Sequence, residues 1–365
     1  MAAPPKIRLL VVDDSAYNRR NIAEIFTNHG EVEVVGKAAD GEEALRLATL
    51  LKPDVITLDL EMPRMDGFTF LRILMSKQPT PVIVVSSYAQ KENVFKALEL
   101  GALDFVTKPD RQISPDASDL REQIVSKVLL VRALRPVAFA PPASRRPAPA
   151  SGSWGTEAKS GTRGTPIEGA RVAPYEPPTR LVAIGSSTGG PSALLEIFGR
   201  IPPTSMIGMV VAQHMPDKFT RTFAERLDRR GPVRTAEAQE GDRVAALTGF
   251  VCPGRQCMDV SMRDGELRLK VGPASPGDRY VPSVDRLLKS AAAAAGPRCV
   301  GVILTGMGDD GVEGARAIRD SGGIVLAESE ETAVVYGMPG SAVRAGVVTE
   351  VLPLSAIAEY LAALV

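Results

Sequence analysis

The chain contains a strand–glycine–helix junction that could either present a nucleophile or bind a phosphate. The segment reads "LVAIGSSTGGPSALLEIF" over residues 181–198, an apolar run that ends in glycines and small hydroxyl residues before a helical pattern begins. A dinucleotide fingerprint needs a glycine where Ser187 stands, and a P-loop needs a Gly-Lys-Ser/Thr end that this segment lacks. The segment does satisfy G-x-S-x-G with Ser187 at its centre, which favours a nucleophile turn.

Two later apolar runs end in a histidine and in a pair of acids. His214 closes "MIGMVVAQH", and Asp309 and Asp310 follow the strand-like start of "VILTGMGDDG". A histidine beside a serine turn can act as a general base, and an acid at a third strand end can orient its imidazole. Taken alone, each feature also fits helix capping, and the acids also fit a calcium-type loop. Together they predict a Ser–His–Asp site whose chain order differs from that of α/β-hydrolases.

Acids, a hydroxyl and a lysine occupy successive strand ends in the first third of the chain. Asp13 and Asp14 end the first apolar run, Asp59 the third, Ser86 the fourth and Lys108 the fifth. Because ligands collect at the carboxyl edge of a parallel sheet, we expect these side chains to converge. Three clustered carboxylates favour Mg²⁺, and the lysine and hydroxyl suit a phosphoryl group on one carboxylate. Helix N-capping would explain one such acid but not the matched set.

Both sites require α/β elements, and the apolar pattern predicts two α/β domains. Residues 6–135 alternate short apolar runs with amphipathic segments, which predicts a (βα)₅ parallel sheet of the flavodoxin-like kind. A second pattern begins at Arg180 and predicts a doubly wound, mainly parallel α/β domain with an antiparallel excursion near 233–272. Residues 136–178 are rich in Pro, Gly and Ala and are typical of a linker. We therefore expect domains at 1–125 and 180–365, separated by a helix end and linker over 126–179.

The overall composition argues against several other classes of protein. The formal net charge is zero, from 43 Lys+Arg and 43 Asp+Glu, so there is no electrostatic case for binding nucleic acid or an anionic membrane. Three cysteines fit reduced thiols rather than a disulfide framework or a zinc site. No apolar run approaches the roughly 20 residues that span a bilayer, and acids follow the first apolar run too closely for a signal peptide. We expect a cytoplasmic protein without membrane insertion.

The first domain resembles the receiver domains of response regulators. The segments "LLVVDDS", "VITLDLEMPRMDG", "VVSS" and "DFVTKP" match that family in order over residues 6–125. The resemblance places Phe105 at the family's switch aromatic, although a plain core aromatic would read the same way. It also implies a phosphorylation site with one phosphoacceptor, a Mg²⁺ ion and two phosphoryl contacts. The resemblance implies Asp59 as the phosphoacceptor. It implies Asp13 or Asp14, Asp59 and the Glu61 backbone carbonyl around the Mg²⁺ ion. Ser86 and Lys108 are implied to contact the phosphoryl group.

The second domain closely resembles the chemotaxis protein-glutamate methylesterases. The segments "AIGSSTGGP", "AQHMPDKFTRTFAERL", "PSVDRLLKSAA", "GVILTGMGDDG" and "VVYGMPGSAV" follow that family in order over essentially all of residues 180–365. The resemblance assigns the triad as Ser187, His214 and Asp310, with no metal in this domain. It also implicates Thr188 and the backbone near Met307 in holding the oxyanion.

Two residues depart from that family's pattern. Ser186 stands where the family usually has alanine, and Asp309 stands where it often has asparagine, so each proposed catalytic residue has a similar neighbour. The extra carboxylate of Asp309 could raise the basicity of the histidine, or do little if it points outward. We expect Ser186→Ala to be nearly silent.

The combined resemblance implies a phosphorylation-activated serine hydrolase. It would remove methyl esters from glutamate side chains of chemoreceptors, deamidate receptor glutamines, and accept its phosphoryl group from a sensor histidine kinase. The unphosphorylated receiver would cover the catalytic cleft. Nothing in the sequence requires more than a monomer. The alternatives are a DNA-binding output, for which the second domain lacks a basic face and helix-turn-helix spacing, and an adaptor that has lost catalysis.

Overall fold

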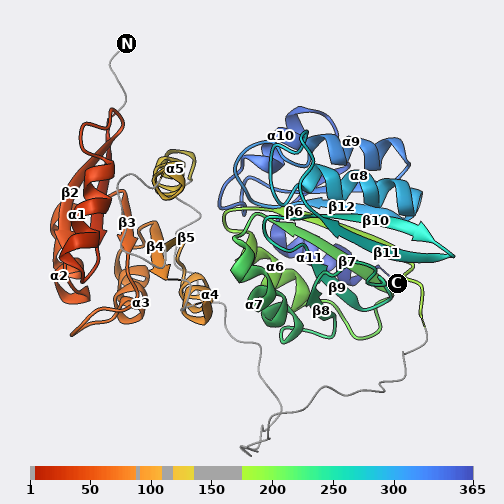
Figure 1. The fold of residues 1–365 in the computed structure, drawn as a ribbon, viewed down its shortest axis with the longest axis horizontal. Coiled ribbons are helices and arrows are strands. Elements are labelled where there is room, and N and C mark those ends of the chain that lie inside the picture. Colours follow the sequence, from red (N-terminus) through yellow and green to blue (C-terminus); the bar gives the residue numbers. More distant parts are fainter. Residues whose placement is uncertain (1–4, 88–90, 109–117, 135–174, 365) are drawn as a thin grey trace, which may run out of the picture.

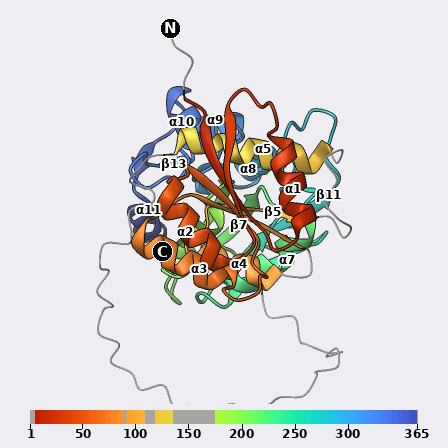
Figure 2. The same ribbon diagram turned by 90° about the vertical axis from the view of Figure 1, so that its left-hand side faces the viewer.

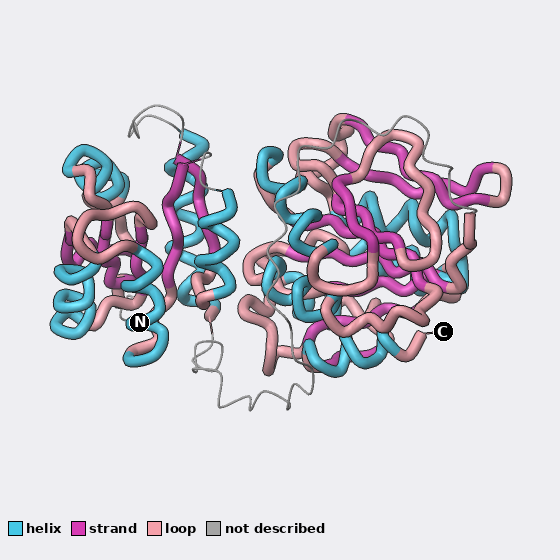
Figure 3. The backbone as a smooth tube through the Cα atoms, turned by 90° about the horizontal axis from the view of Figure 1, so that it is seen from below, coloured by secondary structure: helices cyan, strands magenta, loops and turns pink. Residues whose placement is uncertain are grey.

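The computed structural model of the protein describes residues 5–87, 91–108, 118–134 and 175–364. Within these ranges the chain forms two α/β domains that lie side by side (Figure 3). The predicted linker at 136–178 falls outside the described residues except for its last four. No helix within the described ranges is both long and apolar enough to cross a membrane.

The first domain is the predicted five-stranded parallel sheet, in the order β2-β1-β3-β4-β5. Its central strands are mostly apolar because helices cover both faces, as in other parallel sheets. Helices α1 and α5 pack on one face, and α2, α3 and α4 on the other. The elements are β1 Ile7–Val12, α1 Ala16–Ile25, β2 Val32–Ala38, α2 Gly41–Leu51, β3 Val55–Leu58, α3 Gly67–Lys77, β4 Val82–Ser87, α4 Lys91–Glu99, β5 Asp104–Lys108 and α5 Ser118–Leu129.

The second domain is built on a seven-stranded sheet in the order β14-β13-β12-β6-β7-β9-β8, all of whose pairs are parallel. Helices α8, α9 and α10 cover one face, and α6, α7 and α11 cover the other (Figure 1). The predicted doubly wound parallel class is therefore confirmed. The strands are β6 Arg180–Ser186, β7 Ile207–Gln213, β8 Arg234–Glu237, β9 Thr248–Val251, β10 Cys257–Arg263, β11 Glu266–Gly272, β12 Cys299–Ile303, β13 Ile324–Glu328 and β14 Glu350–Leu352. The helices are α6 Gly190–Phe198, α7 Asp217–Asp228, α8 Val284–Ala295, α9 Val312–Asp320, α10 Met338–Arg344 and α11 Leu354–Ala362.

The antiparallel excursion expected near 233–272 consists of the hairpin β10–β11 and an antiparallel bridge between Arg243 and Arg268. Strands β8 and β9 instead extend the main sheet in parallel. Residues 238–247 connect β8 to β9 and pack against the hairpin on the way. There the Gly241 N–H donates to Leu269 O at 2.9 Å. A crossover of this kind is what a parallel pair requires, and the short polar strand "RTAE" gave little signal for it.

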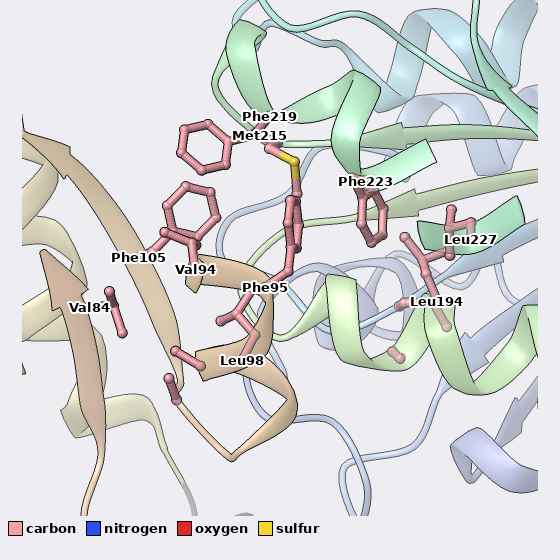
Figure 4. Close-up of a cluster of buried hydrophobic side chains, with 14 of the residues drawn as sticks. Val84, Val94, Phe95, Leu98, Phe105, Leu194, Met215, Phe219, Phe223 and Leu227 are labelled. Carbon is pink, nitrogen blue, oxygen red and sulfur yellow. The ribbon is translucent and has the colours of Figure 1, made fainter. Parts of the chain in front are cut away.

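The two domains share a large hydrophobic cluster and a smaller one around Leu103, Leu130 and Val335. Phe95 of α4 stacks on Phe223 of α7, with ring centroids 5.6 Å apart, and Phe105 of β5 packs against Phe219 of α7 at 4.7 Å (Figure 4). Arg226 borders the cluster and forms ion pairs with two glutamates of α4. The first domain thus lies over the second through its α4–β5–α5 side (Figure 2).

Candidate active site

Ser187, His214 and Asp310 lie at the carboxyl ends of three adjacent strands. Ser187 follows the central strand β6, His214 follows β7 on one side, and Asp310 lies in the turn after β12 on the other. The register pairs Ser186 with Gln213, and the His214 N–H donates to Ser186 O at 3.0 Å. Parallel pairing therefore brings these residues to one edge of the sheet.

Asp310 holds His214 by a hydrogen bond between Oδ2 and Nε2 of 2.8 Å. The carboxylate is buried, with 2% of the residue exposed. It sits at the start of α8, where its two oxygens accept the backbone N–H groups of Val284 at 2.8 Å and Asp285 at 2.9 Å. These N–H groups have no partner within the helix, and together with the helix dipole they compensate the buried charge.

Asp285 returns the same interaction to the turn that carries Asp310. Its Oδ1 accepts the N–H groups of Gly311 at 3.0 Å and Gly314 at 2.8 Å, at the start of α9. Burial raises the pKa of Asp285, and the nearby Asp310 charge adds to that increase. Asp310, from the turn before α9, thus binds N–H groups at the start of α8, and Asp285 of α8 binds N–H groups at the start of α9. This exchange fixes the turn after β12.

Of the two neighbouring acids, only Asp310 contacts the histidine. The side chain of Asp309 is 48% exposed and accepts hydrogen bonds from Arg279 and from the Tyr280 hydroxyl, both at 3.2 Å. The turn after β12 therefore points the two carboxylates in different directions, and the extra acid is turned toward solvent.

The two serines of the turn also face different surroundings. Ser186 is fully buried and its hydroxyl donates to Gln213 Oε1 at 2.6 Å. Ser187 is half-buried, and its hydroxyl forms no hydrogen bond with any residue in the described ranges. Its backbone is held on both sides, because its N–H donates to Thr305 O at 3.0 Å and its carbonyl accepts Gln213 Nε2 at 2.8 Å. The Ser187 hydroxyl is not bonded to His214 here, which is common in enzymes without substrate.

Backbone N–H groups near Ser187 remain available for an oxyanion. Neither the Thr188 nor the Met307 N–H donates to another of the residues that the structure describes, and the Met307 side chain is 51% exposed. Helix α6 begins at Gly190, three residues after Ser187, after Gly189 with a φ of +80°. That left-handed conformation favours glycine and turns the chain so that the helix starts directly behind the serine.

A buried glutamate lies behind the nucleophile turn. Glu328, at the end of β13, accepts the Thr305 N–H at 2.8 Å, and Thr305 in turn contacts Ser187 and Thr188. Burial raises the pKa of Glu328 to about 7. A protonated carboxyl can occupy this apolar position without a counter-ion.

The receiver forms part of the wall of the catalytic cleft. A cavity of about 510 Å³ is bounded by His214, Tyr280 and Arg255 on one side and by residues of β5 and α5 on the other. Asp104 of β5 accepts a hydrogen bond of 2.5 Å from the hydroxyl of Thr188, the residue next to the candidate nucleophile. The same carboxylate oxygen pairs with Lys127 of α5.

The predicted acidic cluster also assembles at the sheet edge of the receiver. Oxygens of Asp13, Asp14 and Asp59 lie within 4.8 Å of one another. Lys108 Nζ is 2.8 Å from Asp13 Oδ2 and 2.5 Å from Asp59 Oδ2. Burial raises the pKa of Asp13, against the attraction of Lys108. The Lys108 pKa is also raised, because Asp59 and Asp13 together outweigh burial.

The remaining predicted receiver residues lie around that cluster or at the domain interface. Ser86 is fully buried at the end of β4, and the Glu61 N–H donates to Asp59 Oδ1 at 3.4 Å, which places the Glu61 backbone beside the acids. Phe105 points instead into the cluster shared with the catalytic domain. It is therefore more than a core aromatic of its own domain.

Several residues that shape the site were not singled out from the sequence. An acid in the first turn of a helix is a recognisable signal, so Asp285 could have been identified as a cap, but not as one that reaches into another helix. No local pattern marks Gln213, Glu328, Asp104 or Tyr280, because their partners are distant in the sequence.

Comparisons with known proteins match both domains. Residues 182–361 match the CheB methylesterase family, and residues 9–114 match the response regulator receiver domain family. The chain is 46% identical to protein-glutamate methylesterase/protein-glutamine glutaminase 1 of Myxococcus xanthus, over 100% of this chain and 99% of that protein. It is also 46% identical to protein-glutamate methylesterase/protein-glutamine glutaminase 3 of Geobacter sulfurreducens, over 96% of this chain and 95% of that protein. The crystal structure of the Thermotoga maritima CheB methylesterase catalytic domain, 38% identical, covers 51% of this chain and 98% of that chain with a TM-score of 0.49.

The raised pKa of Glu328 predicts a pH-dependent stability. Folded Glu328 keeps its proton up to about pH 7, whereas an unfolded glutamate releases it near 4.5, so the wild-type free energy of unfolding should fall as pH rises through this window. Glu328→Gln keeps an acceptor for Thr305 but cannot ionise. Its stability advantage over wild type should therefore grow with pH, to an upper limit of roughly 3 kcal/mol.

Urea unfolding at several pH values, compared with Glu350→Gln on the exposed edge of β14, measures this difference. A Glu328→Gln advantage that is constant with pH would show that folding leaves the pKa of Glu328 unchanged.

Proposed function

Because this chain belongs to the CheB methylesterase family and carries a response regulator receiver domain in front of its catalytic domain, we propose that it hydrolyses glutamate methyl esters of chemoreceptors under the control of phosphorylation. Its relatives are named protein-glutamate methylesterase/protein-glutamine glutaminase, so deamidation of receptor glutamines is included in the proposal. We assign the receiver to residues 1–125 and the catalytic domain to residues 180–365. A DNA-binding output finds no support in a domain of this family.

The observation that carries the proposed chemistry is the hydrogen bond between Asp310 and His214 beside the Ser187 turn. The Asp310 carboxylate accepts a hydrogen bond from the N–H at Nε2 of His214. This leaves Nδ1 unprotonated and able to act as the base. His214 takes the hydroxyl proton of Ser187 while Ser187 Oγ attacks the ester carbonyl. The imidazolium then protonates the leaving methoxide, and methanol departs.

The acyl-enzyme is hydrolysed by the same groups in reverse. His214 takes a proton from water, the hydroxide attacks the acyl carbon, and the proton returns to Ser187 Oγ as glutamate is released. With a glutamine substrate the leaving group is ammonia. In both steps the negative oxygen is bound by backbone N–H groups, for which Thr188 and Met307 are the candidates.

The receiver is proposed to accept a phosphoryl group on Asp59 from a sensor histidine kinase. Asp13, Asp14 and Asp59 offer the clustered oxygen ligands that Mg²⁺ prefers, and the Glu61 backbone lies beside them. When bound, the ion would neutralise charge on the incoming phosphoryl oxygens. Ser86 and Lys108, at the ends of the next two strands, are positioned to contact the phosphoryl group.

Control is proposed to pass through β5, because this strand serves both sites. Its last residue, Lys108, pairs with Asp59, whereas its first, Asp104, holds Thr188 beside the nucleophile. Between them, Phe105 packs against Phe219 of the catalytic domain. A phosphoryl group on Asp59 forms its own ion pair with Lys108 and so favours a different position of β5. In that position the first domain no longer covers the cleft, and the receptor can enter it. We propose that the protein acts in the cytoplasm as a monomer without membrane insertion.

Replacing each serine of the turn separates the nucleophile from its neighbour. Ser187→Ala should lower receptor demethylation by about 10³-fold or more, because the attacking oxygen is lost. Ser186→Ala should keep nearly the wild-type rate, although it leaves Gln213 Oε1 without its buried donor and should lower the free energy of unfolding by about 1–3 kcal/mol. Methanol release from methyl-labelled receptor and urea unfolding measure the two effects. An inactive Ser186→Ala with an active Ser187→Ala would reverse the assignment, and an inactive wild type would indicate an adaptor.

The phosphoacceptor is tested by Asp59→Asn. This variant keeps the size of the side chain but cannot form an acyl phosphate, so its activity should remain at the unphosphorylated level in Mg²⁺ and a small phosphodonor such as acetyl phosphate. Wild type should be activated under the same conditions. Activation of Asp59→Asn to the wild-type level would place the phosphoryl group elsewhere.

The contact between the domains is tested by Asp104→Ala, which removes the acceptor of the Thr188 hydroxyl. A hydrogen bond to a charged group contributes about 1.5–3 kcal/mol, so unphosphorylated activity should rise by about tenfold or more. The phosphorylated activity should stay near the wild-type value, because the cleft is already open. Glu33→Ala, an exposed acid of β2, is the matched control. An unphosphorylated Asp104→Ala no more active than wild type would rule out this contact as a restraint.

A further inference from the structure

Among the residues that the structure describes, one side chain, that of Asp310, forms a hydrogen bond with the imidazole of His214, and the imidazole also lies against an aromatic ring. The ring of Tyr280 is nearly parallel to it, with centroids 5.3 Å apart and an interplanar angle of 12°. A bond to Nε2 alone fixes one atom of the ring, whereas a parallel neighbour fixes its plane. Tyr280 lies just before α8, in the segment that leads into the N–H groups bound by Asp310.

Tyr280 is itself held by two contacts that do not involve His214, with Asp309 and with Arg279, and these two residues also contact each other. Its hydroxyl donates to Asp309 Oδ1 at 3.2 Å, and Arg279 donates to the other oxygen of Asp309 at 3.2 Å. The Arg279 guanidinium also lies 5.5 Å from the centre of the Tyr280 ring. Burial, followed by the Asp309 charge, raises the pKa of Tyr280, so the phenol stays protonated and remains a donor.

The turn after β12 leaves space for this ring. Gly308 has a φ of +89°, and a Cβ at this position would lie 2.7 Å from the Tyr280 hydroxyl oxygen. The tyrosine therefore packs directly on the backbone of the turn that carries Asp309 and Asp310. The acid that the sequence suggested as a rival of Asp310 is used to anchor the ring that covers His214.

We propose that Tyr280 is a positioning residue for the reaction: its ring fixes the plane of the His214 imidazole, and Asp309 with Arg279 fixes the ring. This inference rests on the proposed Ser187–His214–Asp310 triad. With the plane fixed, Nε2 stays on Asp310 and Nδ1 stays available to Ser187. The face of the phenol also stabilises the imidazolium that forms when His214 takes the serine proton.

Kinetics of the phosphorylated full-length protein test the role of the ring. Tyr280→Leu should lower kcat about tenfold with KM within about twofold, because the ring acts on the histidine and not on the substrate. Tyr280→Phe keeps the ring and should lose less than about threefold, and Asp309→Ala, which only releases the anchor, should fall between the two. Tyr360→Leu, in α11, is the matched control and should match wild type. A Tyr280→Leu loss confined to KM would make Tyr280 a substrate contact and overturn the proposal.

The state of the imidazole gives a readout that a general loss of stability would not move. The chain has only two histidines, so ¹⁵N-labelled histidine gives two sets of ring signals, and His29→Gln identifies those of His214. In its neutral form, His214 should show a single tautomer with Nε2 protonated in wild type and Tyr280→Phe, and averaged nitrogen shifts in Tyr280→Leu. Wild-type shifts in Tyr280→Leu would overturn the proposal.

The variant Asp309→Ala keeps the test open if Tyr280→Leu does not fold, since Asp309 is half-exposed. Averaged shifts in Asp309→Ala support the anchor, and wild-type shifts and kcat overturn it. Failure of the triad itself is recognised separately, because it would leave Ser187→Ala active whatever Tyr280 does.

Discussion

The buried Asp310 carboxylate is the constraint on which the catalytic domain depends. A charge with 2% exposure needs several partners, and this one has the His214 ring and two N–H groups at the start of α8. Each partner fixes a different part of the domain: the histidine fixes the end of β7, and the N–H groups fix α8 against the turn after β12. Because Asp285 returns the same interaction to α9, neither helix can shift without uncovering a charge.

The nucleophile turn depends on a second, mostly neutral network. Gln213 accepts a hydrogen bond from the Ser186 hydroxyl and donates one to the Ser187 carbonyl. Thr305 connects the turn to the buried carboxyl of Glu328. Ser186, which the sequence pattern set aside in favour of Ser187, is therefore part of the support of that residue. Ser186 and Asp309 have this in common: each stands next to a proposed catalytic residue, and each binds a residue that holds the site in place.

The sequence predicted a feature well where a local run of residues has a single physical explanation. Apolar runs predicted the parallel strands, and the acids that follow them identified the acidic cluster of Asp13, Asp14 and Asp59. The residue pattern alone left open which of Asp309 and Asp310 meets His214, because that depends on how a glycine turn directs two adjacent side chains; only the family resemblance chose Asp310, the residue that bonds His214. The roles of Asp104 and Tyr280 were likewise beyond it, since their partners come from another domain or another strand end.

The contact between the domains has the composition that a reversible cover needs. Its centre is aromatic, with Phe95 and Phe105 against α7, and its edge carries ion pairs of Arg226 that are partly exposed and individually weak. A change from 1% to 99% open requires about 5.5 kcal/mol, which is more than one new phosphoryl contact supplies in water. The proposed control therefore requires a closed state that is held by only a small margin. A single charged hydrogen bond at the nucleophile turn, from Thr188 to Asp104, is a contact of the right size to provide that margin, and β5 places it four residues from the lysine that pairs with Asp59.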